Sequence, residues 1–284
     1  MLIAGRNGMV GGKHYTAKDY VQDGLIAMWD GIENAGWGVH DGNARYITDL
    51  IGGEQLSLAD ETYCGHDCIV CNSGEINDRK SRSAAVCSAQ YPSTRQIEIS
   101  IKLTSMWTAS NSAAQGYRSF QYFINAGTPY SNAGTRGRQI YCPLDSDGTA
   151  YKRILLVRDP SDPYEKRGFD GFYQYFNTRC SISASVVGDD AYINGNYVQI
   201  NTSGRNQSSA YWRNTFIGGI SGEVMCIRFY SRALSADEIA HNYEIDRIRF
   251  NLDGGGGYSV VLLFFKATSQ SNTNAASLRW KEAA

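Results

Sequence analysis

Alternation of apolar and polar residues is the clearest pattern along this chain, and it predicts β-strands. In the run 96–107 (QIEISIKLTSMW), Ile97, Ile99, Ile101 and Leu103 alternate with mostly polar neighbours. One face of this strand is expected to be buried and the other to meet water. Further strand candidates lie at 23–30, 118–125, 139–142, 152–157, 169–176, 181–187 and 215–219.

A tight hairpin is predicted at 191–200 (AYINGNYVQI), where Asn194-Gly195 stands between two alternating runs. That dipeptide tolerates the positive φ angles of a type I′ turn, which suits the twist of two antiparallel strands.

One capped helix is predicted near the end of the chain, after a strand in the stretch 222–250. Ser235 and Glu238 have the spacing of a capping box, in which each side chain accepts a hydrogen bond from the other residue's backbone N–H. Apolar residues follow at helical spacing, so one helix face should pack on the preceding sheet. Short strands, polar turns and a single helix, without βαβ alternation, predict an antiparallel sandwich.

The flanks and one internal region look different from this pattern. Residues 1–22 are predicted to be an extended N-terminal arm, and 23–250 the folded domain. The remainder, 251–284, reads as a glycine-rich joint, a strand and a polar tail. The region 57–91 is polar and predicted to be irregular, although it holds four cysteines.

Composition narrows the function classes. The formal net charge of −1 on 284 residues gives no electrostatic indication of nucleic-acid binding. No apolar run approaches the ~20 residues of a membrane helix, and the N-terminus lacks a signal-peptide core. The 7 cysteines are odd in number and are interpreted as mostly free thiols. The protein is expected to be made and kept in a cytosol, or to leave it without the general secretory route.

Four motifs in order resemble the laminin-G-like, concanavalin A-like lectin/glucanase superfamily: GLIAMWDG, ITDLIGG, AYINGNYV and IRFYSRALSADEIAHNY. The resemblance covers about residues 23–250. It implies a jelly-roll of two antiparallel sheets, with a short C-terminal helix and terminal arms outside the family pattern. It also implies a binding or structural module rather than a catalyst. The opening stretch GLIAMWDGIENAG resembles a variant found in proteins of gut bacteria and their phages.

Catalytic motifs are not found. The glucanases of this superfamily place Glu, Asp and Glu at alternate positions of one strand. Here Glu244 and Asp246 come closest, but position 248 is Ile and the segment is predicted to be helical. A phosphate-binding loop at Lys13 lacks the required Gly and Ser or Thr. The chain is therefore predicted not to be an enzyme.

Two groups of residues have the chemistry of metal ligands. Cys64, Cys68 and Cys71 have the spacing of an iron–sulfur site, and His66 between them allows a zinc site. The preferred interpretation is reduced thiols in a loop or strand. Calcium stays an alternative to having no cofactor, because carboxylates in turns can supply hard oxygen ligands. The candidate carboxylates are Asp145, Asp147, Asp189 and Asp190.

Exposed aromatic side chains are the candidate sugar-binding residues. Tyr211 and Trp212 follow a polar loop, and Trp37 lies in a turn-rich segment, so these three are predicted to stack on carbohydrate. Trp29 and Trp107 are predicted to pack in the core.

The first functional hypothesis is a non-catalytic module of a larger assembly. The most plausible assembly is a phage virion (capsid decoration, head fibre or tail), assembled from a protein made in the host bacterial cytoplasm. Its partners would be other virion proteins and further copies of this chain. The apolar strand after the joint would add to a neighbouring sheet through Tyr258, Val260, Leu262 and Phe264, unless it pairs within its own sandwich. The alternative is a carbohydrate-binding module on a bacterial surface or on a phage adsorption apparatus.

Overall fold

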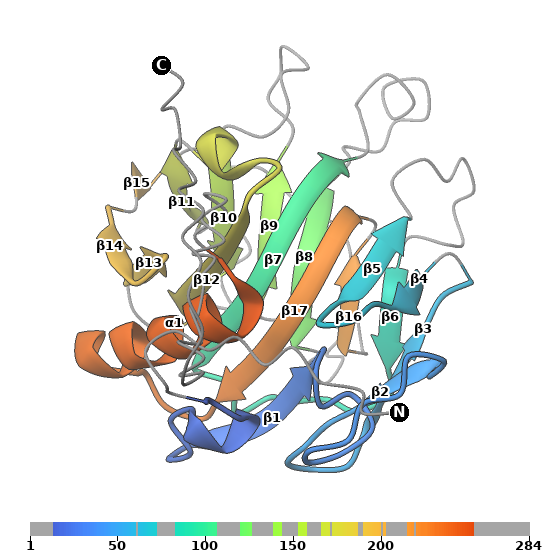
Figure 1. The fold of residues 1–284 in the computed structure, drawn as a ribbon. Helices are drawn as coiled ribbons and strands as arrows, with labels where there is room; N and C mark the ends of the chain where they lie inside the picture. The colour runs from blue at the N-terminus through green and yellow to red at the C-terminus, as the bar shows by residue number, and fades with distance from the viewer. Residues whose placement is uncertain are drawn as a thin grey trace, which may run out of the picture. The chain divides into compact units, whose positions relative to one another are not determined.

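A computed structural model of the protein describes residues 14–60, 62–72, 83–106, 120–126, 139–143, 153–157, 166–170, 172–186, 190–199, 201–202, 215–218 and 220–252. Most of these residues belong to β-strands (Figure 1). The first nine strands are β1 (Leu25–Asp30), β2 (Tyr46–Thr48), β3 (Gln55–Leu58), β4 (Thr62–Cys64), β5 (Ile69–Asn72), β6 (Ser83–Cys87), β7 (Gln96–Met106), β8 (Phe120–Ala126) and β9 (Gln139–Pro143). The others are β10 (Arg153–Val157), β11 (Lys166–Asp170), β12 (Arg179–Ser185), β13 (Ala191–Ile193), β14 (Asn196–Val198), β15 (Asn201–Thr202), β16 (Thr215–Gly218) and β17 (Ile220–Tyr230).

The strands form two antiparallel sheets. The eight-stranded sheet has the order β14-β13-β12-β7-β17-β5-β4, with β1 paired to β17 beside the end of β5. The nine-stranded sheet has the order β15-β11-β10-β9-β8-β16-β6-β3-β2. The hairpin prediction is confirmed: β13 and β14 pair through Asn194 and Gly195, whose φ angles are 52° and 70°.

The main core lies between the two sheets. The predicted apolar face of β7 is confirmed, because Ile97, Ile99 and Ile101 are fully buried. They belong to the same cluster as Ile124 of β8 and Ile217 of β16, which come from the other sheet. Burying each such side chain contributes about 1.5–3 kcal/mol relative to leaving it exposed. Trp29 is also buried here, as predicted, while Trp107 lies outside the described residues.

A second core lies on the outer face of the eight-stranded sheet, under helix α1 (Ala236–Phe250) (Figure 1). Ser235 accepts from the Glu238 N–H while Glu238 accepts from the Ser235 N–H, so the predicted capping box is confirmed. The register of β17 shifts between Val224 and Cys226, which sends Val224 into the first core and Cys226 into the second. Within the described residues, no helix is long and apolar enough to cross a membrane.

The described part of the predicted arm, residues 14–22, packs against this outer layer and is called the N-terminal segment below. It contains a 3-10 helix at Ala17–Asp19, and both Ala17 and Tyr20 are buried in the second core. Sequence reasoning did not anticipate these contacts, because so short a segment has no apolar periodicity of its own. The domain limits 1–22, 23–250 and 251–284 stay predictions, and 253–284 lies outside the described residues.

Two local predictions are wrong. The region 57–91 is not wholly irregular: it contributes β4, β5 and β6 to the sheets. Cys64, Cys68, Cys71 and Cys87 are all buried there and behave as small apolar residues, so a pattern that looks polar still builds strands. The strand predicted at 169–176 ends at Asp170, and a 3-10 helix follows at Phe172–Tyr175.

A close backbone approach joins two loops at one end of β1. A Cβ atom built on Gly31 would lie 2.5 Å from the carbonyl oxygen of Asp67. Glycine is therefore needed for the loop after β1 to meet the turn between β4 and β5. Both loops line the cavity described next.

Candidate functional site

A buried cluster of charged side chains supports the candidate site from beneath. Arg228 of β17 binds Glu98 of β7 at 2.9 Å and Asp246 of α1 at 2.7 Å, and all three side chains are at most 2% exposed. Ser100 and Ser181 donate to the same Asp246 Oδ2 atom. Removing one partner of such a buried pair commonly costs about 3–5 kcal/mol. The cluster therefore fixes α1 on the sheet.

Tyr20 closes this cluster from the N-terminal side. Its hydroxyl donates to Asp246 Oδ1 at 2.6 Å, and the Arg228 guanidinium carbon lies 4.0 Å from its ring centroid. Burial and, after it, the neighbouring Asp246 carboxylate raise the pKa of Tyr20 well above its usual value. The hydroxyl is thus held as a hydrogen-bond donor and not as a base.

A second set of charges links α1 to the loop after β1. Arg249 binds Asp30 at 2.6 Å and Glu33 at 3.1 Å. Glu33 also accepts the backbone N–H of Ala17 and that of Gly38, each at 2.7 Å. One carboxylate therefore joins the N-terminal segment, the loop 31–40 and the last turn of α1.

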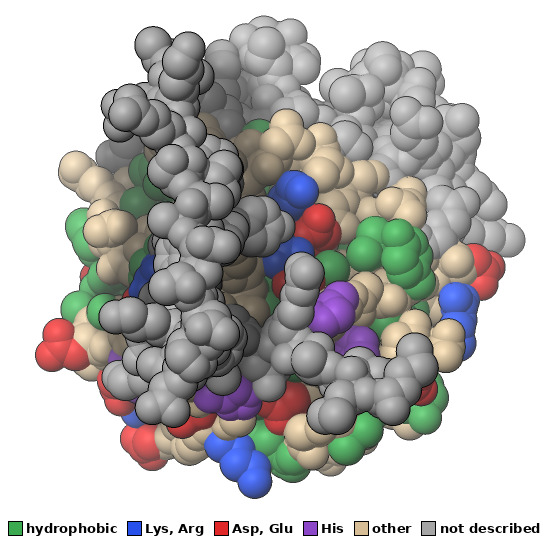
Figure 2. Space-filling model, in the orientation of Figure 1, with side chains coloured by type: hydrophobic (Ala, Val, Ile, Leu, Met, Phe, Trp, Pro, Cys, Tyr) green, Lys and Arg blue, Asp and Glu red, His purple; other side chains and the backbone are tan. Residues whose placement is uncertain are grey.

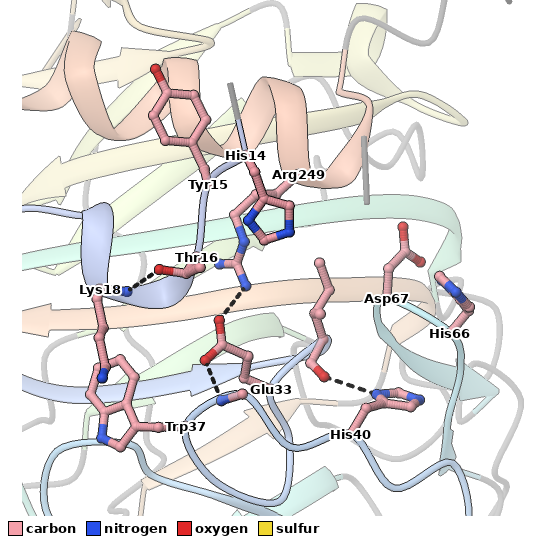
Figure 3. Close-up of a pocket in the computed structure, with 12 residues that line it drawn as sticks. His14, Tyr15, Thr16, Lys18, Glu33, Trp37, His40, His66, Asp67 and Arg249 are labelled. Atoms are coloured by element: carbon pink, nitrogen blue, oxygen red, sulfur yellow. Dashed lines mark hydrogen bonds and ion pairs between the residues drawn. The ribbon is translucent and has the colours of Figure 1, made fainter. Parts of the chain in front are cut away.

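Above this carboxylate lies a cavity of about 490 Å³. It is lined by residues of the N-terminal segment, the loop 31–40 and the turn at 66–67, with Arg249 from α1 (Figure 3). On the face drawn in Figure 2, histidine side chains lie among acidic and basic ones. Pockets with a few convergent polar groups are the usual places for a bound ligand.

One wall of the cavity carries an aromatic side chain with a cation above it. Trp37 is 37% exposed, and the Lys18 ammonium lies 5.6 Å from its ring centroid. Figure 3 shows Trp37 on one side of Glu33 and His40 on the other. An indole at a cavity wall offers a flat apolar surface beside polar groups.

The opposite wall carries two histidines from different loops. The rings of His40 and His66 have centroids 6.3 Å apart. His40 Nδ1 lies 3.0 Å from the carbonyl oxygen of Ile32. Because a carbonyl only accepts, Nδ1 carries a hydrogen and Nε2 is left as the second polar atom of the ring.

A chain of ion pairs runs from the cavity along residues of β12, β17 and β7. Asp67 binds Arg179 through both carboxylate oxygens, at 2.6 and 3.0 Å. Arg179 also binds Glu223 at 2.7 Å, and Glu223 meets Lys102 at 3.3 Å. The carboxylate at the cavity rim is thus held in place by a partner on β12.

Of the predicted sugar-binding residues, only Trp37 can be placed, and it lines the cavity. Tyr211 and Trp212 lie outside the described residues, and so do the predicted assembly residues Tyr258, Val260, Leu262 and Phe264. Their predicted roles stay predictions.

The predicted metal ligands are only partly placed. Asp145, Asp147 and Asp189 lie outside the described residues, while Asp190 is exposed and its backbone carbonyl accepts from Ser185. Across the described ranges, no group of three or more His, Cys, Asp or Glu side chains is placed to hold a metal ion.

The cysteines proposed as cluster or zinc ligands are free and buried. Burial raises the pKa of Cys68 to about 12 and raises that of Cys71 further, which disfavours the thiolates that metals need. The interpretation as reduced thiols in strands and loops fits these positions.

Sequence reasoning missed most of the cavity. His14, Lys18, Glu33 and His40 come from segments without a motif, and they meet only because α1 and the N-terminal segment pack over the sheet. His66 was noticed only as a possible metal ligand. The sequence offered one signal for this site. Three of the 4 histidines stand directly before an aromatic or acidic residue, as in His14-Tyr15, His40-Asp41 and His66-Asp67.

Comparison with known proteins leaves the family open. No family model matches the chain, and no curated protein matches it. Among solved structures, a Trypanosoma rangeli sialidase in complex with sialic acid is 11% identical, with a TM-score of 0.48 over 82% of this chain and 34% of its own. The botulinum neurotoxin type G receptor-binding domain is 16% identical, with a TM-score of 0.41 over 79% of this chain and 52% of its own.

The chain thus spans about a third of that sialidase and about half of the toxin domain. At TM-scores this low, neither similarity assigns a ligand or an activity to it. The resemblance to the laminin-G-like, concanavalin A-like superfamily stays a prediction.

Proposed function

We propose that this domain is a non-catalytic module that binds a glycan in the cavity between the N-terminal segment, the loop 31–40 and the turn 66–67. The observation that carries the proposal is the cavity itself, with the half-exposed indole of Trp37 at one wall and polar side chains around it. Sugar rings present an apolar face of C–H groups and a rim of hydroxyls. An indole beside hydrogen-bonding groups complements both.

The two carboxylates of the cavity favour binding over catalysis. Glu33 and Asp67 are both held by arginines, and Glu33 is only 6% exposed. A glycosidase of the common kind needs one carboxyl that gives up a proton and one that attacks or activates water. Carboxylates engaged by guanidinium groups are poorly suited to the first of these tasks.

The jelly-roll topology predicted from sequence belongs to the same proposal. It is supported by two antiparallel sheets enclosing one core and by the pairing of β1 with β17, which brings the first and last strands of the domain together. The ligand would then bind beside the end of β1, between the loop 31–40 and the turn 66–67, which the pairing of β1 with β17 brings together.

A glycan array compares the wild type with Trp37→Ala. The substitution should weaken the signal at least roughly tenfold, because truncating a central aromatic contact commonly costs more than ~1.4 kcal/mol. Tyr63→Ala is the matched control, since Tyr63 is an exposed aromatic (51%) outside the cavity. Trp212→Ala tests the site predicted from sequence. A wild type that binds no glycan, or a Trp37→Ala variant that binds normally, would refute the cavity proposal.

A second role, as a structural component of a larger assembly, is favoured by a different observation. Exposed tyrosines lie on three edge strands: Tyr46 on β2, Tyr63 on β4 and Tyr197 on β14, at 43%, 51% and 57% exposure. Tyrosine is enriched at protein interfaces. These edges are only three residues long, which favours side-chain contacts over strand addition.

The proposed assembly is a phage virion, with a bacterial surface as the alternative location. Mass spectrometry of purified particles and of envelope fractions decides between the two. Absence from both would refute an assembly role. The two functions are compatible, because a module carried on a particle can present a glycan site.

A further inference from the structure

Histidines are concentrated at the cavity. His14, His40 and His66 line it, and together they are three of the 4 histidines in the chain. They come from the N-terminal segment, the loop after β1 and the turn between β4 and β5. The fourth, His241, lies on α1 and contacts the backbone carbonyl of Asp19 at 2.9 Å.

The negative charges of the carboxylates that face this cavity are already balanced by arginines and hydrogen-bond donors of the protein. Glu33 is bound by Arg249 and by two backbone N–H groups. Asp67 is bound by Arg179 through both oxygens. Asp19 lies outside the lining and accepts from the N–H and the hydroxyl of Thr16. None of these carboxylates is left to attract a cationic ligand strongly.

The basic side chains of Lys18 and the cavity histidines have fewer charged partners than the carboxylates do. Within the described part of the chain, Lys18 and the three cavity histidines form no ion pair with a carboxylate. The Lys18 ammonium instead lies over the Trp37 ring. Besides the histidines, the lining contains two cations, Lys18 and Arg249, and two anions, Glu33 and Asp67. The Tyr15 hydroxyl is the remaining titratable group of the lining. The formal charges of these cations and anions cancel when the histidines are neutral, and each protonated histidine adds one positive charge.

From these charges we infer that the cavity selects an anionic sugar, one bearing a carboxylate or a sulfate, and binds it more tightly as the pH falls. This inference rests on the proposed glycan-binding function. The sugar ring would lie against Trp37, while its anionic group would meet Lys18 on that side or the His40 and His66 rings on the other. Histidine is the side chain whose charge most readily changes near physiological pH.

The test is an array of neutral galacto- and gluco-oligosaccharides, oligogalacturonates and sulfated galactans, read at about pH 7.5 and about pH 5.5 to span the titration of a free imidazole. The anionic glycans should bind more tightly than the neutral ones. Their signal should rise roughly five- to tenfold at the lower pH, since each new cation close to the anionic group attracts it even at a solvated site. The separate carboxylate and sulfate arms show which anion is preferred.

Variants separate the histidines from Lys18. The combined substitutions His14→Gln, His40→Gln and His66→Gln should abolish most of the gain at low pH and leave binding at the higher pH nearly unchanged. Lys18→Gln should weaken anionic glycans at both pH values. Arg45→Gln is the control, because Arg45 is an exposed cation absent from the cavity lining. This control should not change the preference.

Equal binding of neutral and anionic glycans through Trp37 would overturn this inference and leave the glycan-binding proposal standing. A pH response that persists in the triple histidine variant would also overturn it. Absence of binding to every arm of the array, at both pH values, would overturn this inference and the proposed function together.

Discussion

At the scale of single residues, Asp246 has the largest number of partners in the buried cluster. It accepts from Tyr20, Ser100 and Ser181 and binds both terminal nitrogens of Arg228. Burial opposes its ionisation, but Arg228 and these donors together lower its pKa. In the sequence, Asp246 stands out only as part of an incomplete glucanase-like carboxylate run. In the structure it is a buried anchor for α1.

We expect Asp246→Ala to lower the free energy of unfolding by about 3–5 kcal/mol, because it leaves the Arg228 guanidinium buried with only one carboxylate partner. Urea denaturation followed by tryptophan fluorescence measures this loss. Asp60→Ala is the control: Asp60 pairs with Arg45 at the surface and is fully exposed, so its removal should leave the midpoint unchanged. A loss no larger than that of Asp60→Ala would show that the cluster does not hold α1.

At the scale of elements, the capped start of α1 depends on one carboxylate. Hydrogen bonds from Arg232 and then from the Ser235 N–H lower the pKa of Glu238 to about 2. The carboxylate therefore ionises more readily in the folded chain than in the unfolded one, where its pKa is near ~4.3. Its contribution to stability is fully present above the unfolded value and is lost as the pH falls through the folded value.

The melting temperature of Glu238→Gln should therefore lie below that of the wild type near neutral pH, and the difference should shrink as the pH falls from ~4.3 toward the folded pKa. Thermal melts across this range provide the measurement. Asp237→Asn removes the neighbouring first-turn charge without touching the capping box, so its effect should be smaller. A difference that stays constant with pH would contradict the role given to the Glu238 charge.

A secondary-structure element could be predicted from the sequence where its signal lies within a few neighbouring residues. The alternation in β7, the Asn194-Gly195 turn and the Ser235–Glu238 cap involve neighbours in sequence, and all were predicted. The strands β4 and β5 are three and four residues long and include buried cysteines, so their alternation is too short and too polar to recognise.

The cavity is the least local feature. Glu33 meets Arg249 across 216 residues, and Gly31 meets Asp67 only because two strands of one sheet bring their loops together. Trp37 was predicted as a surface aromatic, but nothing in the sequence around it indicates a cavity. Such contacts depend on the packing of α1 and the N-terminal segment, and single-residue patterns do not encode them.

At the scale of the whole molecule, the N-terminal segment links the second core to the candidate site. Tyr20 covers Arg228, the Val21 N–H donates to Asn242 of α1, and the Ala17 N–H binds Glu33. The same segment supplies His14 and Lys18 to the cavity. The stability of the outer layer and the shape of the site therefore depend on residues that were predicted to lie outside the domain.

Two shortened chains test this dependence. A chain lacking residues 1–13 keeps every contact named above, and a chain lacking residues 1–22 loses all of them. We expect the second deletion to cost at least about 3–5 kcal/mol more than the first, as for the loss of a large buried aromatic side chain, and to abolish glycan binding. Chemical denaturation and the array measure the two effects. Equal stability of the two chains would place the domain boundary at residue 23, and the outer layer would then be stabilised by α1 and the sheet alone.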